Sequence, residues 1–160
     1  MVALPTAPAP ATDRTAPLPS GLEILQGIAS GRLPRPGVAT LLGMTMEEVE
    51  AGRVVFALTP RPELGNPLGT VHGGMITTLL DSAMGCAVHS VLPPGAGYTT
   101  VELKVNFVRP ILLDDGPVRA EGTIIHVGGR LATAEGRVLD DQGRLVAHAT
   151  TTCMIFRPSD

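Results

Sequence analysis

The sequence predicts an α+β fold in which one long helix lies inside a curved antiparallel sheet. The first observation behind this prediction is a mostly apolar stretch, residues 66–91, which begins rich in Gly and Pro and continues with helical periodicity. The second is residues 98–109, where apolar and polar side chains alternate as they do in a half-buried strand. The third is a series of further β-type runs joined by short turn signals, which predicts an antiparallel meander.

The predicted central helix has one apolar face and one small, polar face. It spans about 19 residues, or roughly 28 Å, which is enough to cross a small domain. We expect the apolar residues at helical spacing to be buried: Ile76, Leu79, Leu80, Ala83, Met84 and Ala87. The opposite face carries small, mostly uncharged polar side chains. Asp81 is the only ionised group of the helix.

Asp81 and the glycines at the start of this helix each allow two interpretations. A carboxylate on so apolar a helix is either hydrogen-bonded as a structural residue or acts as a base or nucleophile in a mostly apolar cleft. The first turn of a helix carries free N–H groups and partial positive charge, and Gly73 and Gly74 would let a ligand approach those donors closely. The same two glycines would equally serve as a tight turn that starts a helix.

The chain before the central helix is expected to hold a tail, a short helix and a hairpin. Residues 1–20, rich in Ala, Pro and Thr, are expected to be a flexible tail without the features of a secretory signal. One domain is expected over residues 21–160, and it begins with a short helix at residues 21–30 that two prolines end. From Gly37 the pattern becomes β, and residues 38–61 are expected to form a hairpin that turns at residues 51–52.

After the central helix the pattern is β to the end of the chain. The turn signals are Gly128-Gly129 and residues 141–143. Strands are expected at residues 98–109, 117–127, 131–139 and 144–156.

Composition excludes several classes of function. With 12 Lys and Arg against 15 Asp and Glu, no basic run and no Trp, the chain lacks the charge and the stacking groups of a nucleic-acid-binding protein. No serine-hydrolase elbow occurs, and the four histidines are scattered, so no metal site and no cofactor are expected. Cys86 and Cys153 lie in apolar segments and are expected to be buried thiols of a cytoplasmic protein. No segment is long enough to span a membrane.

A motif at the start of the central helix resembles a known family. The string Asn66-Pro67-Leu68-Gly69-Thr70-Val71-His72-Gly73-Gly74, followed by Leu79-Leu80-Asp81, resembles the hotdog-fold acyl-CoA thioesterases and, within them, the phenylacetate-degradation (PaaI-like) group. The similarity continues through residues 101–107 and Arg109-Pro110 and covers about residues 35–157. It implies a hotdog fold and a hydrolase that cleaves acyl-CoA to free acid and CoA, with aryl-acetyl or other short acyl groups.

The resemblance also implies roles for the residues of this motif. Gly74 would supply the main N–H group that polarises the thioester carbonyl. Asn66 would position the water or the carbonyl, and His72 would orient the loop. Asp81 would either activate water or attack the carbonyl to form an anhydride, and the sequence leaves both routes open.

Other site residues are expected across the cleft and at its mouth. Thr100 would assist Asp81, and Thr99 is the alternative. The alternation of the strand favours Thr100, because it lies on the polar face. Coenzyme A carries phosphates, for which Lys104, Arg109 and Arg130 are candidate partners, although each also fits a solvated surface charge. With Gly73, these three form the expected substrate-binding set.

The spacing of the motif predicts that the active site is built from two chains. Asp81 lies nine residues after His72, or roughly 13 Å along a helix, too far for one carbonyl to reach both groups. Two antiparallel helices around a two-fold axis would bring them together. The resemblance implies the same dimer, within a homotetramer. Two other functions remain open: a hotdog dehydratase or hydratase acting on acyl thioesters, and a non-catalytic acyl-CoA-binding protein.

Overall fold

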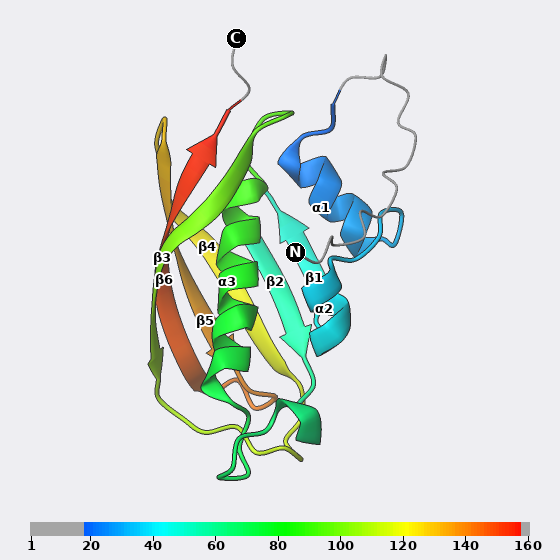
Figure 1. The fold of residues 1–160 in the computed structure, drawn as a ribbon, viewed down its shortest axis with the longest axis vertical. Coiled ribbons are helices and arrows are strands. Elements are labelled where there is room, and N and C mark those ends of the chain that lie inside the picture. The colour runs from blue at the N-terminus through cyan, green and yellow to red at the C-terminus, as the bar shows by residue number, and fades with distance from the viewer. Residues whose placement is uncertain (1–17, 158–160) are drawn as a thin grey trace, which may run out of the picture.

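The computed structural model describes residues 18–157, in which a six-stranded antiparallel sheet wraps helix α3 (Gly73–His89) (Figure 1). The order of the strands in the sheet is β1-β2-β4-β5-β6-β3. This arrangement confirms the predicted fold class. The bounds are β1 (Thr45–Glu50), β2 (Arg53–Leu58), β3 (Gly97–Phe107), β4 (Val118–Val127), β5 (Leu131–Leu139) and β6 (Leu145–Phe156).

Helix α3 packs closely on the middle of the sheet because glycines replace side chains there. A Cβ atom on Gly122 of β4 would lie 2.4 Å from the backbone carbonyl of Ala83, and one on Gly136 of β5 would lie 2.9 Å from the side chain of Met84. The six residues predicted to form the apolar face of the helix are all at most 2% exposed. The apolar periodicity therefore identified the buried face of the helix correctly.

The order of the strands differs from a simple meander. β4, β5 and β6 pair in sequence as predicted, but β3 lies at the far edge beside β6, while β4 pairs with β2. Helix α3 carries the chain across the sheet from β2 to β3, and the loop after β3 carries it back to β4, so β3 is not a neighbour of either strand. As a result β3, which is 11 residues long, is an edge strand.

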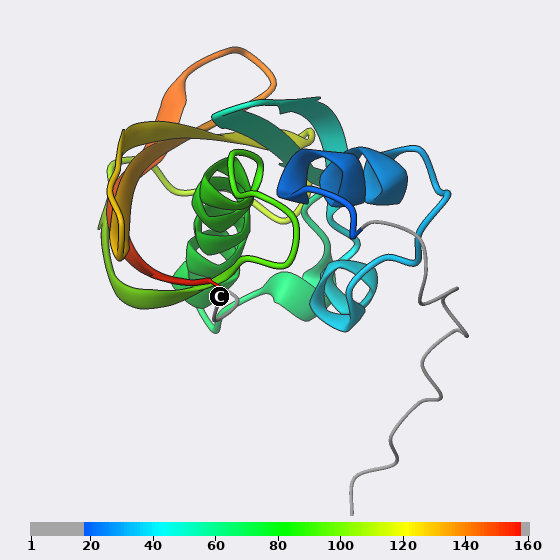
Figure 2. The same ribbon diagram turned by 90° about the horizontal axis from the view of Figure 1, so that it is seen from above.

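Two helices cover the open side of the curved sheet (Figure 2). Helix α1 (Gly21–Ala29) confirms the predicted short helix and begins with a capping box between Ser20 and Glu23. Its first residue packs directly on the end of α3: the N–H of Gly21 donates to the carbonyl of Leu92, and a Cβ there would lie 1.9 Å from the carbonyl oxygen of His89. Of the predicted tail, residues 1–17 lie outside the described residues.

The expected start of the hairpin at Gly37 is wrong, because Gly37–Leu42 forms helix α2. The periodicity of so short an apolar run is compatible with both a strand and a helix. Pro36 precedes the helix in an extended conformation, and Gly43 ends it with a left-handed φ of 71°.

The predicted hairpin turn is confirmed, since β1 and β2 are joined at Ala51-Gly52 and Gly52 has a φ of 84°. A single turn of 3-10 helix, η1 (Pro62–Leu64), follows β2. Within residues 18–157, no helix is both long and apolar enough to cross a membrane.

Candidate active site

Asp81 lies in the middle of α3 and is held by a residue of the neighbouring edge strand. The hydroxyl of Thr100 donates a hydrogen bond of 2.8 Å to Oδ1 of Asp81. Thr99, the alternative partner, is exposed to solvent. The structure thus places Thr100, and not Thr99, against Asp81. Simple alternation of side chains along the strand does not explain this position.

A β-bulge determines which face of β3 carries Thr100. The register of β3 against β6 shifts between Thr100 and Glu102, so that Val101 is an extra residue and is 49% exposed. Leu103 packs against the core and therefore lies on the helix-facing side of the sheet together with Thr100. Uninterrupted alternation would have placed Leu103 and Thr100 on opposite faces.

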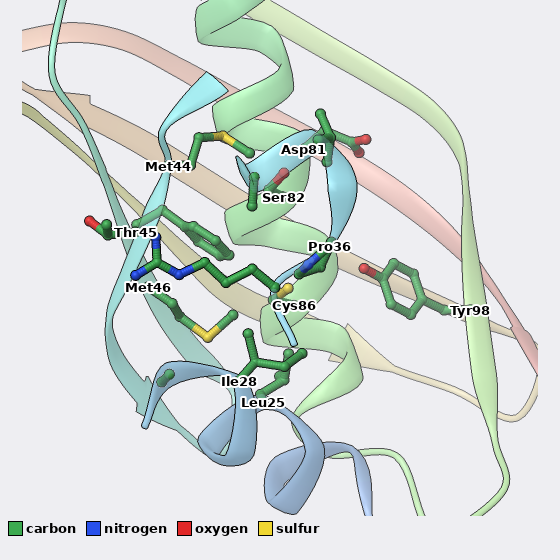
Figure 3. Close-up of a pocket in the computed structure, with 15 residues that line it drawn as sticks. Leu25, Ile28, Pro36, Met44, Thr45, Met46, Asp81, Ser82, Cys86 and Tyr98 are labelled. Atoms are coloured by element: carbon green, nitrogen blue, oxygen red, sulfur yellow. The ribbon is translucent and has the colours of Figure 1, made fainter. Parts of the chain in front are cut away.

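Asp81 lines a cavity of about 260 Å³ between α3 and the two covering helices (Figure 3). One wall is polar and comes from α3 and β3, with Asp81, Ser82, Cys86 and Tyr98. The other wall is largely apolar and comes from α1, α2, β1 and β2. Among the residues that the structure describes, the exposed Arg35 is the only basic one in the lining. The cavity therefore offers one carboxylate beside a hydrocarbon surface.

Tyr98 and Cys86 stay neutral beside Asp81. The hydroxyl of Tyr98 points toward Cys86 (Figure 3). Burial raises the pKa of the Cys86 thiol to about 12, and burial also raises the pKa of Tyr98. Tyr98 fits there because position 85 is glycine, where a Cβ would lie 2.6 Å from the phenol oxygen. Both cysteines are free thiols.

The start of α3 presents two N–H groups that differ in their hydrogen bonding. His72 is the N-cap residue, and its Nδ1 accepts a hydrogen bond of 2.9 Å from the N–H of Gly74. Within the part of the chain that the structure describes, the N–H of Gly73 donates no hydrogen bond. The N–H of Gly74 becomes available to a ligand only when the exposed imidazole turns away.

The side chain of Asn66 organises the loop before α3. Its Nδ2 donates to the hydroxyl of Thr70 at 2.8 Å, and its Oδ1 accepts from the N–H groups of Leu68 and Thr70. Among residues 18–157, Thr70 is the only acceptor of the Asn66 amide, so one of its hydrogens is left to contact a substrate or water. The role of Asn66 in positioning the reacting groups stays a prediction.

The candidate cations are not gathered around Asp81. Arg109 lines a second cavity, of about 370 Å³, together with Gly73 at the start of α3, and its guanidinium donates to the carbonyl of Leu145 at 2.5 Å. Lys104 on β3 and Arg130 in the turn between β4 and β5 are exposed and do not line the cavity of Asp81. No group of three or more potential metal-ligating side chains occurs within residues 18–157.

Sequence reasoning missed Ser82, Tyr98 and the whole apolar wall of the cavity. Gly85, whose lack of a side chain admits Tyr98, carried no sequence signal that distinguished it from other glycines. The amphipathic pattern of residues 21–30 predicted a helix, but it contained nothing about where that helix docks. These residues become part of the site only through contacts between distant segments.

The model of the family named Thioesterase superfamily matches residues 68–147. A curated relative from Halobacterium salinarum, named provisionally as an esterase, is 33% identical over 104 residues, which are 62% of this chain and 67% of the relative. The chain belongs to the thioesterase superfamily. The six-stranded sheet around α3 is accordingly the hotdog fold, and the chain is a thioester hydrolase.

Two further proteins are similar to this member of the superfamily. A crystal structure of a phenylacetic acid degradation-related protein from Ralstonia eutropha is 32% identical with a TM-score of 0.74, covering 81% of this chain and 98% of the other. The 1,4-dihydroxy-2-naphthoyl-CoA hydrolase of Listeria monocytogenes is 23% identical over 119 residues, which are 74% of this chain and 95% of that enzyme. The resemblance to PaaI-like thioesterases that the sequence indicated is confirmed.

Proposed function

We propose that this thioester hydrolase cleaves an acyl-CoA to the free acid and coenzyme A, with Asp81 as its catalytic carboxylate. The observation that carries the proposal is the position of Asp81, hydrogen-bonded to Thr100 and lining a largely apolar cavity. A small cavity of this kind suits an acyl group and its reacting carbonyl. The proposal that coenzyme A is the thiol part of the substrate rests on the relative from Listeria monocytogenes, which is named as a CoA hydrolase.

The reaction requires a nucleophile and a group that stabilises negative charge on the carbonyl oxygen. Asp81 either removes a proton from the attacking water or attacks the carbonyl carbon to form an anhydride that water then cleaves. In both routes the C–S bond breaks, and the sulfur of coenzyme A leaves as a thiol after taking up a proton. The backbone N–H groups at the start of α3 stabilise the oxyanion, helped by the partial positive charge of the helix terminus.

Gly73 is the better placed donor in this chain. Its N–H has no hydrogen bond among the described residues, and Gly73 lines the same cavity as Arg109, whereas the N–H of Gly74 is bonded to His72. Gly74 remains a second donor when the imidazole moves.

Distance requires that the carboxylate and the donor come from different chains. Gly73 and Asp81 are eight residues apart on one straight helix, or about 12 Å, and they line different cavities. A carbonyl oxygen needs its donor at roughly 3 Å. Two antiparallel copies of α3 satisfy both requirements, because each then places its Asp81 beside the start of the other.

The edge strand β3 supports this dimer. Among the described residues, its 11 residues have no neighbouring strand on one side, and Val101 and Phe107 on it are 49% and 53% exposed. An edge of this length with exposed apolar side chains is a ready template for pairing with another strand. Two copies of β3 that pair around a two-fold axis would extend the sheet and bring the two α3 helices side by side.

The test of the function is Asp81→Asn against the exposed Asp114→Asn as the matched control. We expect Asp81→Asn to lower kcat at least ~100-fold, as loss of a general base or nucleophile does, with an unchanged melting temperature. Activity is measured as release of free thiol from a panel of acyl-CoA thioesters, with water addition to enoyl-CoA as the second assay. Turnover of Asp81→Asn within about threefold of the Asp114→Asn control would refute the assignment of Asp81.

A further inference from the structure

The wall of the cavity opposite Asp81 comes from a part of the chain outside the match to the family model. Residues 68–147 contribute only Asp81, Ser82, Cys86 and Tyr98 to the lining. Helices α1 and α2 contribute what we call the helical wall, defined as Leu25, Ile28, Ala29, Val38 and Ala39. The reacting carboxylate and the surface facing it thus come from separate segments, so the helical wall can differ between proteins that share the same chemistry.

The helical wall is fixed in place by backbone contacts and by burial. Gly21 anchors the start of α1 on the end of α3, where no side chain would fit. Leu25 and Ala39 are 3% and 6% exposed and belong to the main core. Arg61 donates to the carbonyls of Leu41 and Leu42 at the end of α2. A wall held by these contacts limits the space above Asp81 and does not simply yield to a larger ligand.

The space that remains is small and adaptable in shape. A volume of about 260 Å³ lies below the range of roughly 300–1,000 Å³ that holds a drug-sized molecule. Met46 of β1 and Met44, which directly precedes β1, also line the cavity (Figure 3). Thioether side chains adapt to irregular shapes and make favourable contacts with aromatic rings.

We propose that the helical wall sets the upper size limit of the acyl group, so that the enzyme accepts compact, mainly apolar acyl groups and rejects long unbranched chains. Leu25 and Ile28 are the specificity-determining residues, and Ala29 marks the open side of the wall, since it is exposed. This inference rests on the proposed function, because it takes the occupant of the cavity to be the acyl part of the thioester that Asp81 attacks.

The experiment measures how the size of the acyl group affects hydrolysis in wall variants. Acetyl-, butanoyl-, hexanoyl-, phenylacetyl-, decanoyl- and palmitoyl-CoA are compared for the parent, Leu25→Ala, Ile28→Ala and Ala29→Leu. Leu41→Ala is the matched control. Leu41 lies on α2, which contributes to the helical wall, but its side chain is 73% exposed and does not line the cavity. The affinities of the matching CoA thioethers, which cannot be hydrolysed, are measured in parallel.

We expect the parent to favour hexanoyl- or phenylacetyl-CoA over palmitoyl-CoA by at least about tenfold in kcat/KM. Leu25→Ala and Ile28→Ala should raise the ratio of decanoyl to hexanoyl turnover by about tenfold, because one methylene in a fitted pocket changes discrimination by ~10- to 200-fold. Ala29→Leu should lower turnover of the larger compact groups and leave acetyl-CoA unchanged. Because Ala29 is exposed, this variant folds even if truncation of Leu25 destabilises α1.

Two results would overturn the inference: equal turnover of palmitoyl- and hexanoyl-CoA by the parent, or the same size profile in all wall variants as in Leu41→Ala. If the profile stays the same while Asp81→Asn is inactive, the proposed function stands and only the role of the wall is refuted. If Asp81→Asn remains active, the assignment of Asp81 fails. The thioether affinities then decide separately whether the wall limits size.

Discussion

The neighbours of Asp81 cannot compete with it in its proposed role as nucleophile or base. The Cys86 thiol has a pKa raised by burial to about 12, and the Tyr98 phenol also has a raised pKa because it is buried. Both are therefore neutral near pH 7. The hydrogen bond from Thr100 fixes one carboxylate oxygen and leaves the other free to act. At the scale of single residues, the site combines one oriented carboxylate with neutral neighbours.

The orientation of Asp81 by Thr100 gives the first prediction at this scale. Thr100→Val keeps the shape of the side chain but removes a hydrogen bond to a carboxylate, of the type worth ~1.5–3 kcal/mol. We expect kcat/KM to fall by roughly 10- to 100-fold. Thr99→Val, which changes the exposed neighbour in the same way, should have no effect. Equal activity of the two variants would show that Thr100 does not orient Asp81.

His89 makes the stability of the protein depend on pH. It is half-buried against the ring of Tyr98, with ring centroids 5.6 Å apart, and burial lowers its pKa below the ordinary value of 6.5. Below about pH 6.5 the unfolded chain therefore binds a proton that the folded protein does not. His89 thus lowers the free energy of unfolding as the pH falls from about 6.5 toward its folded pKa, and its effect levels off below that value.

The measurement is urea unfolding at pH 7.5 and pH 5.5 for the parent and for His89→Gln. The parent should lose more stability than the variant between these pH values, since a glutamine side chain does not titrate. Carboxylates that titrate over the same range contribute equally to both proteins and cancel in the comparison. An identical loss in both proteins would contradict a lowered pKa for the half-buried His89.

At the scale of the elements, the distance between α3 and the sheet depends on glycine. Gly122 and Gly136 lie on neighbouring strands and are paired with each other in the register of β4 and β5. Both lie beneath the segment of α3 that contains Ala83 and Met84. With side chains at these positions, the helix would lie further from the sheet. The close packing therefore helps to set where Asp81 stands relative to β3.

Gly122→Ala tests this packing. The added Cβ would lie 2.4 Å from backbone atoms of Ala83, which cannot move as a flexible side chain can, and overpacking of this kind costs ~1–3 kcal/mol. We expect the melting temperature to fall by roughly 3–10 °C. Gly97→Ala is the control, since a Cβ on that strand glycine meets nothing within 4 Å. Similar melting temperatures for both variants would refute the close contact.

At the scale of the whole molecule, the proposed reaction needs two chains, and this can be tested by complementation. Asp81→Ala removes the carboxylate. Gly73→Pro removes the N–H donor but should keep the helix, because proline is accepted in the first turn and His72 before it is extended, with ψ of 132°. Gly73→Ala, which retains the N–H, is the control and should keep far more activity than Gly73→Pro, although its Cβ would lie 3.2 Å from the ring of Phe107.

Mixing the two inactive proteins should restore activity. Each mixed dimer has one site that lacks both groups and one intact site. Random pairing makes about half of the dimers mixed, so roughly a quarter of parental activity should return after co-refolding in equal amounts. No recovery, with mixed dimers confirmed by mass spectrometry, would mean that each site lies within a single chain.

Periodicity in the sequence determined most of the elements. The buried face of α3, the hairpin turn at Ala51-Gly52 and the run of β4, β5 and β6 are each visible in side chains that are close together along the chain. The exception is Gly37–Leu42, which is too short for its period to distinguish helix from strand. Its caps, Pro36 and Gly43, were the local signal that indicates a helix.

The sequence by itself also predicted which residues carry the chemistry, because the motif from Asn66 to Gly74 and Asp81 lies within one loop and one helix. Only the tertiary structure decided that Thr100 meets Asp81, since this depends on a bulge at Val101 that follows from pairing with β6. It also decided that α1 and α2 close the cavity and that β3 is an edge strand. These features arise from contacts between segments far apart in sequence, for which local periodicity carries no information.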